Sequence, residues 1–230
     1  MNYELVIFDC DGVLIDSEPI ANRVLSEQLA GIGLRLPAGE VMRRFVGRTR
    51  AGCLALAAEL LGRALPAGFA AAWDAALFSA FAAELKAVDG VAEVVQGLQV
   101  PVCVASNSSR ERMCASLQAA GLLPLFEGRM FSAVDVERPK PAPDLFLHAA
   151  ATMGAPPSRC AVIEDTPTGV QAAAAARMAV FGYAGGAHSS PAALAAAGAI
   201  VFREMRALPA LLRASSGRAS PLPPPSGARR

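Results

Sequence analysis

Six short apolar runs constrain the fold of this chain more than any other feature. Most of them are apolar at consecutive positions, which is typical of strands buried on both faces of a parallel sheet. The runs are Leu5–Phe8, Val102–Ala105, Arg129–Phe131, Ala161–Ile163, Ala179–Phe181 and Ile200–Phe202. After about Val88, helical patterns separate the runs, at 110–120, 144–153, 169–177 and 192–197. Strands that alternate with helices predict an α/β fold with a doubly wound, Rossmann-like parallel sheet.

The stretch 17–87 interrupts this alternation. It contains no strand-like run, and glycines and prolines divide it into helical segments at 19–30, 38–45, 51–61 and 66–86. We therefore expect a small helical cap over 17–87, inserted after the first strand of an α/β core that comprises 1–16 and 88–212. The segment 213–230 is rich in Pro, Ser, Gly and Arg and is predicted to be a disordered tail.

The composition narrows the classes of function. The 230 residues are 53% hydrophobic, which is ample for a buried core, and the formal net charge of +1 argues against a dedicated nucleic-acid or membrane-surface binder. Neither a membrane-length apolar run nor a signal-peptide pattern occurs. The five cysteines lack Cys-x-x-Cys spacing and are expected to be small buried side chains in a reducing compartment. We expect a monomeric, cytoplasmic protein.

Polar side chains cluster where three of the predicted strands end. Ligands of open α/β sheets bind at the carboxyl ends of the strands, so these groups should meet in one crevice. They are Asp9, Asp11, Ser106, Asn107, Glu164 and Asp165. Like charges that converge on one crevice repel unless a cation neutralises them, and oxygen ligands with spare positions for water suit Mg²⁺. An Asp-x-Asp or Glu-Asp pair alone would be a weak signal; their convergence favours a metal site.

Two further groups suit a phosphate ligand. Ser106 lies between a strand and a helix, and its hydroxyl, Asn107 and the helix N-terminus could hold phosphate oxygens, although a simple helix cap is an equal alternative for Ser106 alone. Lys140 lies between Pro139 and Pro141, which restrict the backbone. The chain has only one other lysine, Lys86, so a point charge between nucleophile and phosphate explains Lys140 better than a surface role.

Together these segments resemble the haloacid dehalogenase superfamily. The nucleophile motif is similar to VIFDCDGVLIDSE, the second motif to SNS, the third to RPKPAPDLF and the acidic fourth to VIEDTPTG. The motifs occur in order over nearly the whole chain apart from its tail. The nearest likeness is to phosphatases and mutases related to β-phosphoglucomutase, including sugar-phosphate and phosphogluconate phosphatases.

The resemblance implies roles for single residues. Asp9 attacks phosphorus, and Asp11 protonates the leaving oxygen and then activates water. Asp9, the backbone carbonyl of Asp11 and Asp165 bind Mg²⁺, with Glu164 as a ligand or a support for one. The catalytic residues are then Asp9, Asp11, Ser106 and Lys140. Residues expected to bind phosphate or substrate are Gly12, Gly47, Arg48, Arg50, Ser106, Asn107 and Lys140.

The predicted activity is an Mg²⁺-dependent phosphatase that hydrolyses a small sugar or sugar-acid phosphate through an aspartyl phosphate. Asp11 favours phosphate esters over halides, since a halide leaving group needs no proton. The alternative is a phosphosugar mutase of the β-phosphoglucomutase type, but Ala21 stands near the point where the mutase carries a histidine. Arg177 stands where relatives commonly end a helix with glycine. A receiver-type phosphoacceptor module also combines an acidic pocket, a hydroxyl and a lysine, but it has no helical cap.

Overall fold

The computed structural model describes residues 3–45, 48–186 and 189–215, and its sheet has six parallel strands. The strands are β1 (Leu5–Phe8), β2 (Val102–Ser106), β3 (Met130–Ser132), β4 (Cys160–Glu164), β5 (Ala179–Tyr183) and β6 (Ile200–Phe202). Their order is β3-β2-β1-β4-β5-β6, so the chain winds outward from β1 to one edge and then from β4 to the other. The predicted doubly wound α/β fold is confirmed. The order reverses between β1 and β4, which is where such sheets open a ligand crevice.

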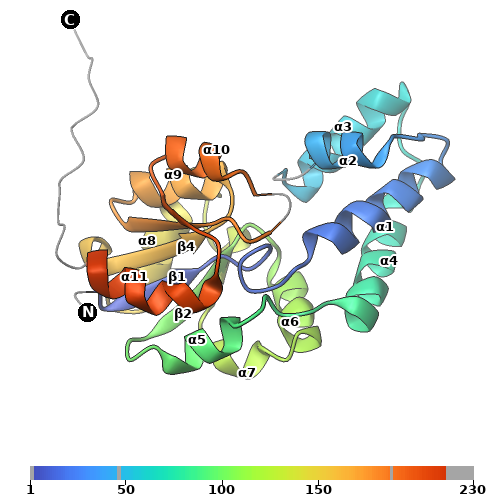
Figure 1. Ribbon diagram of the computed structural model, residues 1–230. Coiled ribbons are helices and arrows are strands. Elements are labelled where there is room, and N and C mark those ends of the chain that lie inside the picture. The colour runs from blue at the N-terminus through green and yellow to red at the C-terminus, as the bar shows by residue number, and fades with distance from the viewer. Residues whose placement is uncertain (1–2, 46–47, 187–188, 216–230) are drawn as a thin grey trace, which may run out of the picture.

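Helices cover both faces of this sheet (Figure 1). One face carries α5 (Val91–Gly97), α6 (Arg110–Ala119), α7 (Leu123–Phe126) and α11 (Leu208–Ser215), and the other carries α8 (Asp144–Thr152), α9 (Pro167–Ala175) and α10 (Pro191–Ala196). Within β1, Val6 and Phe8 belong to the first apolar layer and Leu5 and Ile7 to the second. Both faces are buried, which is why the strand is apolar at every position.

Four helices follow β1 and project away from the sheet, on the right of Figure 1. They are α1 (Glu18–Gly31), α2 (Ala38–Phe45), α3 (Arg50–Leu61) and α4 (Phe69–Glu84), here called the helical cap. Helix α1 packs against α4 and α2. All four lie within one or a few residues of the predicted segments.

At the other end of the chain, α11 includes 213–215, which the sequence pattern assigns to the tail; the remaining tail, 216–230, lies outside the described residues.

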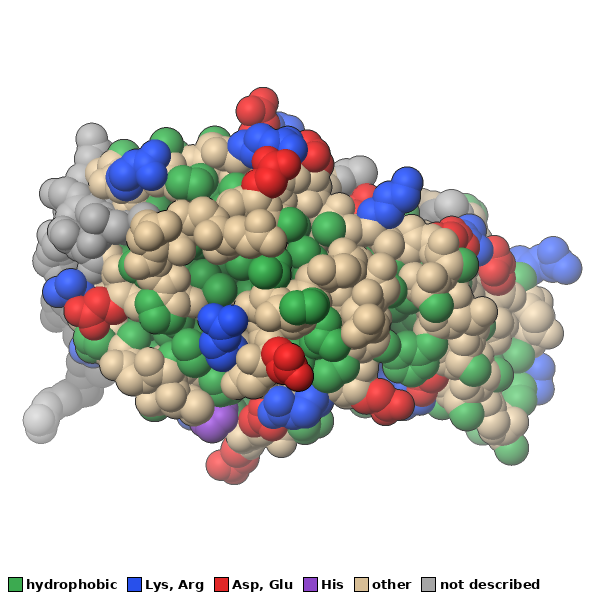
Figure 2. Space-filling model, turned by 90° about the horizontal axis from the view of Figure 1, so that it is seen from below, with side chains coloured by type: hydrophobic (Ala, Val, Ile, Leu, Met, Phe, Trp, Pro, Cys, Tyr) green, Lys and Arg blue, Asp and Glu red, His purple; other side chains and the backbone are tan. Residues whose placement is uncertain are grey.

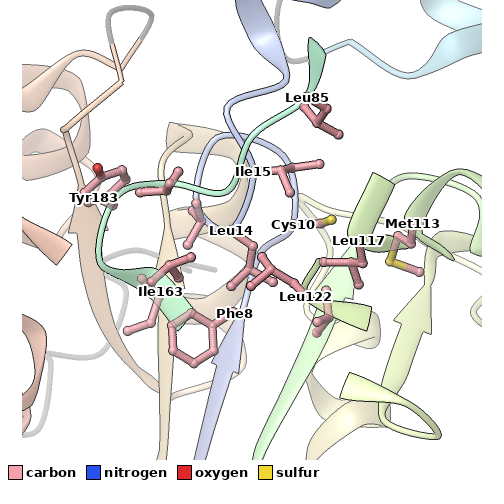
Figure 3. Close-up of a cluster of buried hydrophobic side chains, with 14 of the residues drawn as sticks. Phe8, Cys10, Leu14, Ile15, Leu85, Met113, Leu117, Leu122, Ile163 and Tyr183 are labelled. Carbon is pink, nitrogen blue, oxygen red and sulfur yellow. The ribbon is translucent and has the colours of Figure 1, made fainter. Parts of the chain in front are cut away.

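A buried apolar cluster fixes the junction between the cap and the core (Figure 3). Phe8 of β1 and Leu14 of the following loop lie in this cluster with Leu85, where the chain returns from the cap, and Leu117 of α6. The two crossings also pair through their backbones, since the N–H of Val88 donates to the carbonyl of Leu14 at 2.9 Å. The loop after β1, which carries the predicted nucleophile motif, is therefore held by apolar packing along its length.

The described surface carries both signs of charge. On the face in Figure 2, acidic and basic side chains lie next to one another among apolar patches. None of the described helices has both the length and the apolar character that a membrane crossing requires. All five cysteines are free thiols, and Cys114 alone among them is partly exposed.

Arg177, which stands where relatives commonly end a helix with glycine, adopts a left-handed backbone conformation with φ of +59° just after α9. This conformation costs a non-glycine residue about 1–2 kcal/mol. Glycine avoids that cost, but the greater entropy of its unfolded chain lowers the stability of the folded state by about 0.4–1 kcal/mol. We expect Arg177→Gly to stabilise the protein by about 0.5–1 kcal/mol and to raise the thermal midpoint by about 1–4 °C. Arg177→Ala keeps the strained φ and serves as the control in thermal unfolding. A lower midpoint for the glycine variant would contradict this account.

Candidate active site

The carboxyl ends of β2, β1 and β4 bring the predicted polar residues to one edge of the sheet, beneath the cap. These strands are neighbours in the sheet. Ser106 at the end of β2, Asp9 directly after β1 and Glu164 at the end of β4 therefore lie at adjacent strand ends. All three are buried, as are Lys140 and Asp165. They line a cavity of about 480 Å³ whose opposite wall comes from the cap. The structure therefore brings together the residues that the sequence places at separate strand ends.

Lys140 joins two carboxylates at the floor of this cavity. Its Nζ lies 2.6 Å from Oδ1 of Asp9 and 2.7 Å from Oε1 of Glu164. Burial alone would lower the pKa of Lys140, but the two carboxylates outweigh burial and raise it, so the side chain stays cationic. The ammonium also lies 4.7 Å from the ring centroid of Phe146. This geometry suits a fixed positive charge beside a nucleophile.

Asn107 holds the Lys140 backbone in place. Its Nδ2 donates to the Lys140 carbonyl at 3.1 Å, and its Oδ1 accepts from the Lys140 N–H at 3.1 Å. Both ends of the amide are thus engaged with the protein, although Asn107 was predicted to bind phosphate. The Ser106 hydroxyl accepts from the N–H of Ser108 at 3.1 Å, and Ser109 rather than Ser106 caps α6. Ser106 therefore keeps its hydroxyl hydrogen for a ligand.

Asp9, Glu164 and Asp165 form an acidic cluster in which one oxygen of each lies within 4.8 Å of the others. Burial raises the pKa of Asp9 well above its usual value; Lys140 opposes this shift, and Glu164 and Asp165 add to it. Three carboxylates against one ammonium leave an excess of negative charge that a divalent cation would offset. The oxygen-only donor set fits a hard cation of the Mg²⁺ type, and Asp9 and Asp165 would hold it.

Glu164 is mainly an organising group. Its Oε1 accepts from Lys140, and its Oε2 accepts from the backbone N–H groups of Asp165 and Thr166 at 3.0 and 3.1 Å. The Thr166 hydroxyl, which caps α9, also donates to Oε2 at 3.0 Å. With both oxygens engaged, Glu164 is better placed to support the cluster than to be a principal metal ligand.

Asp11 lies apart from this cluster. Its Oδ1 accepts from the Ser17 hydroxyl at 2.7 Å and from Nη2 of Arg112 at 3.1 Å, while its Oδ2 accepts from the Ser108 hydroxyl at 2.7 Å. Burial alone would raise the pKa of Asp11, but the Arg112 charge and these hydrogen bonds bring the pKa below its usual value. Its side chain lines the cavity and is not in the acidic cluster; the metal role predicted for Asp11 concerned its backbone carbonyl.

Three partners of Asp11 were missed by the sequence analysis as members of the site, namely Ser17, Ser108 and Arg112. Arg112 lies in the first turn of α6, the helix that begins directly after β2. That position was an available signal, since the first turn of such a helix adjoins the carboxyl edge of the sheet. Nothing in the pattern, however, distinguishes Arg112 from its neighbour Arg110, which is exposed and pairs with Asp135 at 2.8 Å.

The predicted cap arginines have different surroundings. Arg50 lines the cavity, but its Nε donates to Oδ1 of Asp74 at 2.9 Å, so its charge is already paired. Arg48 also lines the cavity, and its Nε donates to the carbonyl of Arg44 at 2.6 Å. Among the described residues, no ion pair involves Arg48. The predicted site residue Gly47 lies outside the described residues.

Gly12 shapes the loop between the two aspartates and the cap. Its φ is +80°, and its N–H donates to the carbonyl of Ile15 at 2.8 Å. The positive φ explains the glycine without a ligand. Its predicted part in phosphate binding stays a prediction.

Gly169 is required by the position of the Glu164 carboxylate. A Cβ at residue 169 would lie 1.7 Å from Oε1 and 1.9 Å from the carboxyl carbon of Glu164. The carboxylate is buried and bonded through both oxygens, so it has little freedom to yield. We expect Gly169→Ala to cost about 1–3 kcal/mol of stability and to displace Glu164 from Lys140. Steady-state kinetics should then show at least about a tenfold loss in kcat.

Gly97→Ala is a suitable control for this substitution, because nothing lies within 4 Å of the added Cβ. Wild-type kcat in the Gly169 variant would show that the Lys140–Glu164 contact does not matter for turnover.

Comparison with known proteins gives one family. A sequence model of the haloacid dehalogenase-like hydrolases matches residues 3–177. A 6-phosphogluconate phosphatase of Escherichia coli is 32% identical over 189 residues, covering 82% of this chain and 86% of that protein. A solved haloacid dehalogenase-like protein of unknown function from Agrobacterium tumefaciens is 37% identical, with a TM-score of 0.81 and coverage of 93% of this chain and 99% of that one. A hydrolase of the same family from Deinococcus radiodurans, solved with bound phosphate and sodium, is 35% identical with a TM-score of 0.78, covering 94% of this chain and 97% of that one.

Proposed function

This chain belongs to the haloacid dehalogenase-like hydrolase family, and on that premise we propose that it hydrolyses a small sugar or sugar-acid phosphate with Mg²⁺. The general class, a phosphoric monoester hydrolase, is that of its named phosphatase relatives. In the proposed reaction Asp9 is the nucleophile and is phosphorylated. The protein would act in the cytoplasm as a monomer on a small-molecule phosphate ester.

The observation that carries the proposal is the position of Asp9. Its carboxylate is held by Lys140 at 2.6 Å, within an acidic cluster and at the floor of a cavity. A phosphomonoester dianion repels a carboxylate, so cationic groups must surround the reacting atoms. Lys140 supplies one of these charges. A divalent ion bound by Asp9 and Asp165 would supply the other and polarise the phosphoryl oxygens.

The chain's own residues divide the remaining tasks. An oxygen of Asp9 forms a bond to phosphorus while the bond from phosphorus to the ester oxygen breaks. Asp11, in its separate hydrogen-bonded position, gives the ester oxygen a proton and later takes one from the water that attacks the phosphorylated Asp9. The pKa of Asp11 is lowered in the ligand-free protein, and a phosphate dianion bound beside it would raise that pKa and favour the protonated form. The Ser106 hydroxyl and Lys140 bind phosphoryl oxygens. The cap covers the cavity and excludes bulk water.

The cavity supports a small substrate. Its volume of about 480 Å³ is of the size of a metabolite pocket. On the cap side, Arg48 has a guanidinium that could bind a carboxylate or hydroxyls of the leaving group. The 6-phosphogluconate phosphatase relative acts on a sugar-acid phosphate, which agrees with this chemistry.

Ala21, at the position that distinguishes the mutase alternative, lines the cavity from α1. A methyl group there has no acid–base chemistry to offer. The ring of His148 packs against Phe131 at 5.5 Å, away from the cavity lining, and His188 lies outside the described residues. These positions favour hydrolysis over phosphoryl exchange between two sugars.

The direct test is release of inorganic phosphate from a panel of sugar, sugar-acid and other small phosphate esters. We expect release from a few of them with Mg²⁺ and none after chelation with EDTA. Conversion of a hexose 1-phosphate to its isomer, with added bisphosphate and without free phosphate, would favour the mutase instead. Metal-independent release would contradict the metal role of the acidic cluster.

A further inference from the structure

Arg112 is a partly buried charged residue to which the proposed reaction assigns no task. It lies in the first turn of α6, which is fixed by the Ser109 cap, since the N–H of Arg112 donates to the Ser109 hydroxyl at 3.2 Å. Only 27% of its side chain is exposed, and it lines the cavity. Moving a guanidinium partly out of water costs solvation free energy, and the contacts that it makes must offset this cost.

The Arg112 guanidinium connects three parts of the molecule. Nη2 donates to Oδ1 of Asp11 in the loop after β1 at 3.1 Å. The guanidinium carbon lies 5.5 Å from the ring centroid of Phe81 in the cap helix α4. Burial alone would lower the pKa of Arg112, but Asp11 and, less strongly, Glu18 of the cap helix α1 raise it. Arg112 is therefore held by the core helix that carries it and by the cap above it, and it reaches the carboxylate between them.

The pattern of donors around Asp11 distinguishes its two oxygens. Arginine donates hydrogen bonds and cannot accept them. Among the described residues, Oδ1 accepts hydrogen bonds from Arg112 and the Ser17 hydroxyl, whereas Oδ2 accepts one from the Ser108 hydroxyl, which can turn to accept instead. A proton on Asp11 therefore belongs on Oδ2.

We propose that Arg112 is a positioning residue that holds Asp11 by Oδ1 and leaves Oδ2 to exchange protons with the substrate. The inference rests on the proposed function. As the Asp9–phosphorus bond forms and the bond from phosphorus to the ester oxygen breaks, the proton on Oδ2 moves to that oxygen and the alcohol leaves. Water then attacks the phosphorus of the phosphorylated Asp9 and gives a proton to Oδ2 of Asp11 while the bond from phosphorus to Asp9 breaks. Inorganic phosphate leaves, and the Asp9 carboxylate and the protonated Asp11 carboxyl group are restored.

The test compares two esters that differ in their need for a proton. The first is whichever alkyl phosphate proves the best substrate in the panel, and its alcohol is a poor leaving group. The second is p-nitrophenyl phosphate, which releases a stable phenolate. The constant kcat/KM reports the steps up to departure of the leaving group, and thus the proton transfer. We expect Arg112→Met to lower kcat/KM about 10- to 100-fold for the alkyl ester, part of the general-acid contribution, and less than about threefold for p-nitrophenyl phosphate. Arg112→Lys, which keeps the charge but not the planar fork, should recover part of the loss.

A second background separates positioning from direct substrate contact. Asp11→Asn should show the same dependence on the leaving group, and adding Arg112→Met to it should cause no further loss. A further loss there would show that Arg112 acts on the ester itself and would overturn the proposal. Equal losses for the two esters would also overturn it, because a merely structural role affects both alike.

Controls keep these outcomes distinct. Arg110→Met removes the other arginine in the first turn of α6, which is exposed and outside the cavity lining, and should leave both constants unchanged. Circular dichroism and thermal unfolding confirm that each variant folds, and the lysine variant carries the test if the methionine variant does not fold. Wild-type protein inactive on every ester with Mg²⁺ would overturn the proposed function and this inference together, whereas an active wild type with equal losses would overturn only the role of Arg112.

Discussion

Asp9→Asn is expected to reduce kcat by about 10⁴-fold or more while the protein keeps its fold. The amide is nearly the same size as the carboxylate and can still accept from Lys140, but it is too weak a nucleophile to form the phosphorylated intermediate. Burial already disfavours the charged form of Asp9, so a neutral amide removes an unfavourable charge when no metal is bound. In EDTA, the thermal midpoint of the variant should equal or exceed that of the wild type.

The measurement is phosphate release with saturating Mg²⁺, accompanied by circular dichroism. Asp89→Asn is the matched control, because its carboxylate is 88% exposed and pairs with Arg206 on the surface. Full activity of a folded Asp9→Asn protein would refute the nucleophile assignment.

Lys140→Met is expected to impair both turnover and stability. Without the ammonium, the buried Asp9 and Glu164 carboxylates lose their common cation. Leaving buried charge uncompensated in this way costs about 3–5 kcal/mol in the metal-free protein, and Mg²⁺ in excess should restore part of it by binding the acidic cluster. We expect kcat/KM to fall by about 10²–10³-fold, the range for removing one cationic or donor group from a reacting centre.

Unfolding in EDTA and in Mg²⁺, together with kinetics, measures both effects. Lys86→Met provides the control, since Lys86 is the other lysine of the chain and is exposed. A Lys140→Met protein with wild-type stability in EDTA would show that the buried ion pairs do not contribute as described.

Features that depend on local pattern were accessible from the sequence. Consecutive apolar positions identified all six strands, although the observed β3 extends from Met130 to Ser132 rather than from residue 129. Glycine and proline breaks separated the four cap helices, and strand ends identified Asp9, Ser106 and Glu164. These features could be predicted because burial on both faces of a strand and helix punctuation act over only a few residues.

The tertiary structure alone decided which of these groups touch. Lys140 contacts Asp9 across 131 positions of the sequence and Glu164 across 24. Asn107 hydrogen-bonds to the Lys140 backbone, although its position in the motif suggested phosphate binding. Arg112 meets Asp11 across 101 positions. Such contacts depend on the register of parallel strands and on how helices pack over them, which no local pattern encodes. The sequence by itself determined the sheet, the cap helices and the strand ends that carry the proposed site residues. The packing of distant segments decided how Asp9 and Asp11 are held apart for the different tasks proposed for them.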